Sequence, residues 1–207
     1  MADALAALRA RIREIEGRPA GERRPVSSGQ APLDALAGGL PCPGLVEVCG
    51  PRGGGRTRLV LGWAAERTRV GERVAWVDPA RLLYPPSAEA LGVSLERLLV
   101  VRAEDAQAAW AAEQLLASGC FGLVVVSEAP DVRGAGRRWE QAAWRGRGTL
   151  VVLTDKPVRD LPADLRFMVQ DDVATVLRRR GGDQGSRLTV PAWPPGLDPW
   201  TSAGGMA

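Results

Sequence analysis

Histidine is missing from this sequence, lysine occurs once, and cysteine occurs three times in 207 residues. Without histidine, His-based general acid/base catalysis and most transition-metal sites are excluded. The cysteines, at positions 42, 49 and 120, are too few and too widely separated for a disulfide framework or a zinc site. Cys49 and Cys120 lie in or just before predicted strands, so we expect both to be buried thiols, and we expect no metal site.

Long apolar segments are also missing. No segment approaches the roughly 20 apolar residues of a membrane-spanning helix, and the N-terminal residues contain no apolar run followed by a cleavage site. These absences predict a cytoplasmic protein that makes no membrane contact. The net charge of +3 is carried almost entirely by arginine, because Lys156 is the only lysine. With 45% apolar residues, a chain of this length can bury the core of one domain without disulfides or metal.

The chain begins with a predicted amphipathic helix over residues 3–16. Its apolar residues recur at spacings of three and four: Leu5, Leu8, Ile12 and Ile15. Such a seam is typical of a helix that docks, either on this domain's own surface or on a second chain. Residues 17–30, rich in Gly, Pro and Ser, predict a linker, and residues 31–190 form the predicted core domain. Residues 191–207 predict a flexible tail.

Within the core, strand and helix patterns alternate, which predicts an α/β fold with a mostly parallel twisted sheet flanked by helices. The predicted strands are 45–49, 73–77, 98–101, 123–126 and 150–154, and the predicted helices are 58–69, 87–91, 106–118 and 137–145. Three later short strands, at 165–169, 173–179 and 187–190, predict a C-terminal antiparallel extension of the sheet.

The segment GPRGGGRT, residues 50–57, has the spacing of the phosphate-binding loop GxxxxGK[ST], with arginine in place of lysine. A strand precedes it and a helix follows it, so backbone amides and a helix N-terminus would converge on a phosphate. The candidate phosphate ligands are Gly50, Arg52, Gly53, Gly54, Gly55, Arg56 and Thr57. Arginine binds phosphate but does not reproduce the geometry of lysine. The alternative interpretation is an ordinary surface turn rich in Gly and Arg.

These residues resemble a known family. The segment 26–57, with a GGLP turn before the strand and the phosphate loop, is similar to the entry into the ATP-binding core of RecA-type recombinases, and LGVSLERLLVV at 91–101 is similar to the next landmark of that family. The resemblance is close over residues 26–128 and looser to residue 190, and it implies a RecA-like core. Within the family, the small size and altered motifs most resemble ImuA, the RecA-related protein of bacterial mutagenesis operons.

The resemblance also implies that groups needed for ATP hydrolysis have been replaced. Ala80 stands where the family places a glutamate that activates water, and Ser127 stands where the Walker B aspartate holds magnesium. Glu128 is adjacent, but successive strand residues point to opposite faces, so we expect it to aim away from the loop unless the backbone bulges there. Ser87 replaces the aromatic residue that stacks on adenine, and Tyr84 is a nearby substitute. We therefore expect no catalytic residues, no required cofactor, and weak or no binding of ATP or ADP.

A DNA-binding segment is implied at residues 130–148, which correspond to a mobile loop of the family. It carries arginines with tryptophans between them: Arg133, Arg137, Arg138, Trp139, Trp144, Arg145 and Arg147. This composition is typical of a sequence-tolerant single-strand site. The alternative, which we favour, is a helix whose tryptophans pack inward beneath solvated arginines. The second loop, 155–164, contains Asp155, Asp160 and Asp164, which would repel phosphate about as much as Lys156 and Arg159 attract it, so we do not expect strand exchange.

The resemblance to ImuA implies protein partners: an ImuB-like hub with an inactive polymerase fold and, through it, the sliding clamp and an error-prone polymerase. Trp193 and Trp200 in the tail are suited to anchor a partner, or the tail folds back on its own domain. The N-terminal seam would mediate self-assembly, or contact RecA recombinase. We expect a non-hydrolysing accessory factor in DNA-damage tolerance. The alternatives are a DNA-stimulated ATPase with atypical residues and a modulator of recombinase filaments.

Overall fold

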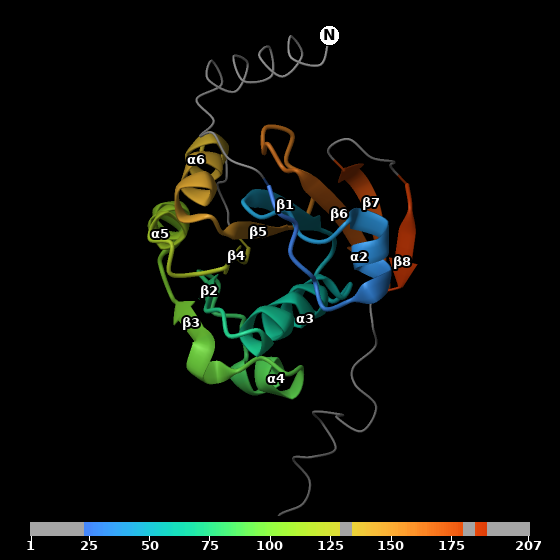
Figure 1. The fold of residues 1–207 in the computed structure, drawn as a ribbon, viewed down its shortest axis with the longest axis horizontal. Coiled ribbons are helices and arrows are strands. Elements are labelled where there is room, and N and C mark those ends of the chain that lie inside the picture. The colour runs from blue at the N-terminus through green and yellow to red at the C-terminus, as the bar shows by residue number, and fades with distance from the viewer. Residues whose placement is uncertain (1–22, 129–133, 180–184, 190–207) are drawn as a thin grey trace, which may run out of the picture.

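The computed structural model describes residues 23–128, 134–179 and 185–189, which form a single sheet covered by helices on both faces (Figure 1). In chain order the elements are α2 (Ala31–Ala37), β1 (Gly44–Cys49), α3 (Arg56–Arg69), β2 (Val74–Val77), α4 (Pro85–Ala90), the 3₁₀ turn η1 (Leu95–Arg97), β3 (Leu98–Val101), α5 (Asp105–Ala117), β4 (Leu123–Val126), α6 (Gly136–Gly146), β5 (Thr149–Thr154), β6 (Leu165–Gln170), β7 (Val173–Arg179) and β8 (Arg187–Thr189).

The strands form an eight-stranded sheet in the order β3-β2-β4-β5-β1-β6-β7-β8. The strands from β3 to β6 are parallel, and β7 and β8 are antiparallel to their neighbours. The predicted α/β fold with a mostly parallel sheet and an antiparallel extension is therefore confirmed. The extension begins one strand later than predicted, because β6 still runs parallel to β1.

The central strands are apolar because they are covered on both faces. Every residue of β1, β2, β4 and β5 is buried, as is usual for parallel sheets between helical layers. One core lies between the sheet and α2, α3 and α4, where Trp63 of α3 packs on Phe167 of β6 with ring centroids 5.9 Å apart. The second core lies under α5 and α6 on the opposite face (Figure 1).

A buried ion pair interrupts the apolar strand β1. Glu47 is fully buried and is paired with Arg166 of β6. Its carboxylate also accepts hydrogen bonds from Thr154 Oγ1 at 3.0 Å and from the backbone N–H of Val158 at 2.7 Å. Glu47 therefore fixes the loop after β5 to the adjacent strands, and each of its polar neighbours compensates for the burial of its charge.

Part of the predicted linker belongs to the folded domain. Val26 pairs with Leu40 in an isolated antiparallel bridge, and Ser28 is fully buried with its backbone N–H donating to Asp34 Oδ1 at 2.9 Å. Asp34 lies on α2, a helix that the sequence analysis did not predict. Its signals were Pro32 in the first turn and Gly38 in the left-handed conformation after the last turn.

The cysteines differ from the prediction at one position. Cys49 is buried as expected, and its burial, with the nearby charge of Glu47, raises the pKa of its thiol to about 11. Cys120 is exposed, because it lies in the turn before β4 rather than in the strand. None of the helices in the described ranges is long and apolar enough to cross a lipid bilayer.

Candidate phosphate-loop site

The glycine loop lies where the sequence predicts, between the carboxyl end of β1 and the start of α3. Gly50, Gly53 and Gly55 have φ values of 148°, 80° and 96°, which side chains rarely adopt. Gly50 also passes directly against β6, because a Cβ there would overlap the carbonyl oxygen of Val169. The strand, loop and helix therefore follow in the order of a phosphate cradle, and α3 begins at Arg56 rather than two residues later.

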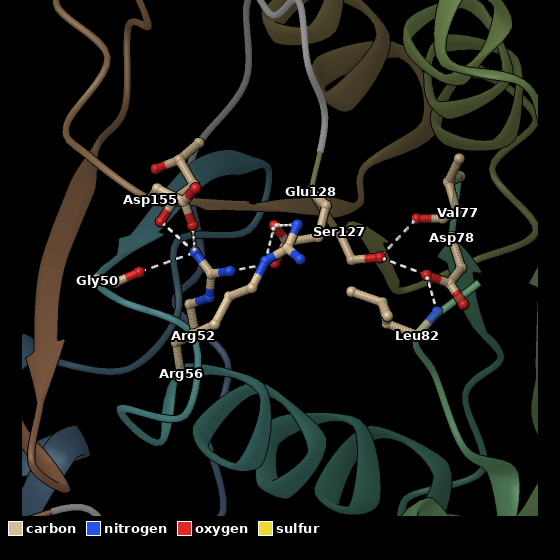
Figure 2. Close-up of polar contacts among 10 residues, drawn as sticks. Gly50, Arg52, Arg56, Val77, Asp78, Leu82, Ser127, Glu128 and Asp155 are labelled. Atoms are coloured by element: carbon tan, nitrogen blue, oxygen red, sulfur yellow. Dashed lines mark hydrogen bonds and ion pairs between the residues drawn. The ribbon is translucent and has the colours of Figure 1, made fainter. Parts of the chain in front are cut away.

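Arg56 is buried, and its guanidinium group is already bound to protein acceptors (Figure 2). Its Nη1 lies 2.9 Å from the Gly50 carbonyl oxygen, 2.6 Å from that of Thr154 and 2.9 Å from Asp155 Oδ1. Its Nη2 is paired with Glu128 Oε1. Arg56 thus connects the carboxyl ends of β1 and β5 with Glu128, two residues after the end of β4. A phosphate would compete with these acceptors for the same donors.

The prediction for Glu128 is wrong. Glu128 was expected to aim away from the loop, but its backbone adopts φ 51° two residues after β4 ends. This left-handed conformation breaks the strand alternation on which the prediction rested. Its side chain, 12% exposed, reaches the loop and binds two arginines. Besides Arg56, Arg52 donates to Glu128 Oε2 from Nε at 3.3 Å and from Nη2 at 3.1 Å (Figure 2).

Ser127 lies at the edge of the site and contacts a second carboxylate. Its hydroxyl donates to Asp78 Oδ1 at 2.9 Å and lies 3.3 Å from the Val77 carbonyl oxygen. Asp78 is buried and also accepts hydrogen bonds from the backbone N–H groups of Leu82 and Leu83. It therefore holds the loop between β2 and α4 (Figure 2). Asp78 was not predicted as a site residue, although its place directly after an apolar strand, at the carboxyl edge of the sheet, was a signal.

The three residues that the RecA resemblance singled out after β2 lie at or near the surface. Ala80 is exposed, Tyr84 is 64% exposed, and Ser87 is half-buried in α4. The described contacts give Tyr84 no ring partner.

The turn between β6 and β7 supplies a further acidic group that the sequence analysis did not identify. Asp171 and Asp172 have φ values of 50° and 59°, and the backbone N–H of Asp172 lies 3.3 Å from the Gly54 carbonyl oxygen. The Asp172 carboxylate is paired with Arg58 on α3 and lies against Gly55. A carboxylate paired with Arg58 therefore lies beside Gly55, at the start of α3.

The predicted DNA-binding segment is divided by the structure. Trp139 is fully buried, and its Nε1 donates to the Ala109 carbonyl oxygen at 2.9 Å. It cannot stack on a base, so the alternative of an inward-packed helix is confirmed for this residue. Trp144 is half-buried, with the guanidinium of Arg23 5.4 Å from its ring centroid. Arg133 lies outside the described residues.

The remaining arginines of this segment are exposed but far apart. Arg137 and Arg138 lie in the first turn of α6, and Arg138 is paired with Glu113 of α5 at 3.3 Å. Arg145 and Arg147 lie at the other end of this 11-residue helix, which at 1.5 Å per residue is about 16 Å long. The structure therefore places the described arginines of this segment in two pairs, one at each end of α6.

The second predicted loop has less free acidic charge than expected. Asp164 is buried, is paired with Arg23, and accepts the backbone N–H of Leu45 at 3.0 Å. Asp155 is paired with Arg56. The candidate partner-binding residues Leu5, Leu8, Ile12, Ile15, Trp193 and Trp200 all lie outside the described residues.

Comparison with known proteins agrees with this geometry. The model of the RecA N-terminal domain family matches residues 11–133, more than half of the chain. Among curated proteins, the chain is 38% identical over 103 residues to Protein RecA of Rippkaea orientalis, 41% over 103 residues to that of Arthrospira platensis, and 38% over 111 residues to that of Paracoccus denitrificans.

These matches cover 49%, 49% and 52% of this chain and 30%, 28% and 31% of the respective relatives. The chain thus matches less than a third of the length of each RecA protein. The matched region contains the β1–loop–α3 unit, the buried Asp78 and the β4 strand that precedes Glu128. The chain belongs to the RecA N-terminal domain family.

Proposed function

We propose that this protein is a non-hydrolysing, RecA-like accessory factor in the bacterial response to DNA damage. The observation that carries the proposal is the state of Arg56. The guanidinium that stands at the lysine position of the loop is buried among two carbonyl oxygens and the carboxylates of Glu128 and Asp155. In phosphoryl transfer, this position neutralises charge on the β- and γ-phosphates. Here the positive charge of Arg56 is neutralised by the carboxylates of Glu128 and Asp155 instead.

Two further positions support the same proposal. Ser127 donates its hydroxyl to Asp78 and offers magnesium no carboxylate. Ala80 has no group that can orient or deprotonate water. Loss of one electrostatic contributor commonly lowers a catalytic rate by about 100- to 1,000-fold. With three contributors altered together, we expect negligible hydrolysis.

The experiment is a measurement of phosphate release at saturating Mg-ATP, with and without single-stranded DNA, beside a RecA recombinase assayed in parallel. We expect background release in both conditions, and no stabilisation of the thermal midpoint by ATP or ADP. DNA-stimulated turnover comparable to that of the recombinase would overturn the proposal. The variant Arg56→Lys tests whether the arginine alone is responsible. We expect it to stay inactive, because Ala80 and Ser127 are unchanged.

The cellular role is proposed from the family and from the resemblance to ImuA. An accessory factor of this kind would scaffold an error-prone polymerase through an ImuB-like hub, or modulate RecA recombinase on single-stranded DNA. Deleting residues 191–207 and measuring affinity for the hub tests the tail with Trp193 and Trp200. Replacing Leu8 and Ile12 by serine tests self-assembly or recombinase contact through the N-terminal seam. If neither change alters its interaction, neither segment is the docking site.

One observation favours a second function, that of a DNA-stimulated ATPase with atypical residues. Glu128 reaches the loop through its left-handed backbone, so a carboxylate is present beside the cradle in spite of Ser127. In this case Glu128→Gln would abolish a turnover that the unmodified protein shows. Under the accessory-factor proposal there is no turnover to abolish, so the same assay separates the two functions.

A further inference from the structure

A second charged site lies at the opposite edge of the sheet from the phosphate loop. The segments that enter β2, β3, β4 and β5 surround a depression with a volume of about 540 Å³. The glycine loop lies at the carboxyl ends of the parallel strands, whereas this depression lies at their amino ends. The full length of the parallel strands therefore separates the two sites, and one cannot be an extension of the other.

Three arginines from three different segments line the depression. Arg73 precedes β2, Arg97 ends the turn before β3, and Arg147 follows α6. Arg97 is held across the rim, because its Nη1 donates to the Gly71 carbonyl oxygen at 2.7 Å. The backbone of Arg147 is fixed in the left-handed conformation, with φ 56°, and its carbonyl oxygen accepts a hydrogen bond from Cys42 Sγ. The guanidinium groups are thus carried on anchored segments.

The negative charge in the depression is already engaged. Glu72 is the only acidic lining residue, and its carboxylate lies against Gly122 and 3.4 Å from Nε of Arg67. Arg67 is itself buried, and its Nε and Nη1 have no hydrogen-bond partner of good geometry. Arg67 does not line the depression, but through its pairing with Glu72 it adds a fourth, buried positive charge beside it that is only partly compensated. Such a group favours the arrival of an anion.

We propose that this depression binds an acidic segment of a partner protein. Guanidinium groups bind carboxylates in a bidentate geometry, and Gly71, whose missing side chain would meet nothing within 4 Å, leaves room for a peptide backbone. Nucleic acid fits less well, because single-strand sites stack bases on exposed rings. The one aromatic lining residue, Phe121, is half-buried and packs against the core under α5. The site does not depend on a nucleotide, so it goes beyond the function proposed above.

The test uses the full chain and a fluorescein-labelled octapeptide of aspartate and glutamate, with binding followed by fluorescence anisotropy. We expect binding that weakens as ionic strength rises, and a loss of affinity of about tenfold or more for Arg97→Ser and for Arg73→Ser. The matched control is Arg102→Ser, which removes the same charge at the other end of β3, where Arg102 is also exposed. It should bind the peptide as the unmodified protein does.

Cys120 supplies an independent readout, because it is exposed and lines the same depression. The peptide should slow alkylation of Cys120 by iodoacetamide, measured by mass spectrometry, and this protection should disappear in Arg97→Ser. The proposal is overturned if the peptide does not bind, if Arg102→Ser loses as much affinity as Arg97→Ser, or if Cys120 is not protected. It is also overturned if a labelled oligothymidylate binds more tightly than the peptide with the same arginine dependence, since the site would then be a nucleic-acid site.

Discussion

Replacing Glu128 by glutamine should destabilise the protein and at the same time open the phosphate loop to anions. Arg56 is 2% exposed, and the side chain of Glu128 is 12% exposed, so their ion pair is buried. Removing one partner of a buried pair typically costs about 3–5 kcal/mol. Glutamine retains an acceptor oxygen, and Arg56 keeps its contacts with Thr154 and Asp155. The expected loss is therefore smaller, about 1–3 kcal/mol in the free energy of unfolding.

Urea denaturation measures this loss, and pyrophosphate measures the second effect. In Glu128→Gln, Arg52 and Arg56 no longer share a carboxylate, so an anion can take its place on the loop. At about 100 times its dissociation constant, pyrophosphate should stabilise the variant by roughly 2.7 kcal/mol. The unmodified protein should gain much less at the same concentration, because Glu128 competes for the same two guanidinium groups.

The control is Glu89→Gln, which removes the same charge from an exposed position on α4. It should change neither the stability nor the response to pyrophosphate. Equal stabilisation of the unmodified protein and Glu128→Gln by pyrophosphate would show that Glu128 does not compete with the anion. An unchanged free energy of unfolding in Glu128→Gln would contradict the burial argument.

Three further predictions concern the scaffold. Arg166→Leu should lower the free energy of unfolding in urea by about 3–5 kcal/mol, because it leaves Glu47 charged and fully buried; Arg178→Leu, at an exposed position of β7, should change it little. Gly50→Ala should lower the free energy of unfolding by at least about 1–3 kcal/mol, and with it the thermal midpoint, because the φ of Gly50 is 148° and a Cβ would overlap a backbone carbonyl. An unchanged midpoint would show that the loop relaxes to accept the side chain. At pH 8, iodoacetamide should modify Cys120 before Cys49, whose buried thiol has a pKa of about 11 and stays protonated below it; faster modification of Cys49 would contradict its burial.

The strands and helices of the core could be predicted from the sequence because their signals are local. Apolar runs bounded by glycine and charged residues predicted β3, β4 and β7 with their observed bounds. The run of β4 is apolar because this central parallel strand is covered on both faces, whereas β3 lies at the edge of the sheet and β7 is antiparallel with alternating burial. The short helix α2 was not predicted, because it has only seven residues and a proline in its first turn. It is too short to show a repeating apolar pattern.

The candidate site was predicted less well, because its geometry depends on single torsions and on distant residues. The glycine loop itself was predicted correctly, since its positive φ values demand glycine at fixed spacings. The direction of the Glu128 side chain depends on the left-handed backbone of Glu128 itself, which the spacing of apolar residues cannot predict. Its bond to Arg56 joins positions 72 residues apart, and the Asp172 turn reaches the loop only because β6 pairs with β1.

For Trp139, by contrast, burial could be predicted from the spacing of residues along the helix. Trp139, Ala142 and Ala143 follow the three- and four-residue spacing of a buried helix face, and all three are buried. The arginines that flank them occupy the solvent side, as that spacing requires. Composition alone suggested a nucleic-acid site, but periodicity should be given more weight than composition wherever a tryptophan lies within a helix.

The altered residues at the loop compensate one another, so changing a single one would not restore a nucleotide site. A lysine at position 56 would be too compact to satisfy the Gly50 and Thr154 carbonyls and Glu128 together, and would leave Glu128 paired with Arg52 alone. A glutamine at position 128 would free the loop but would leave Arg56 buried and would supply no carboxylate at position 127. Asp172 would still place a negative charge beside Gly55 in either case. Arg56 contacts both Glu128 and Asp155 directly, so we expect the effects of changing these residues to be non-additive. A cradle that serves the stability of the fold rather than the turnover of ATP, as proposed above, would show this coupling.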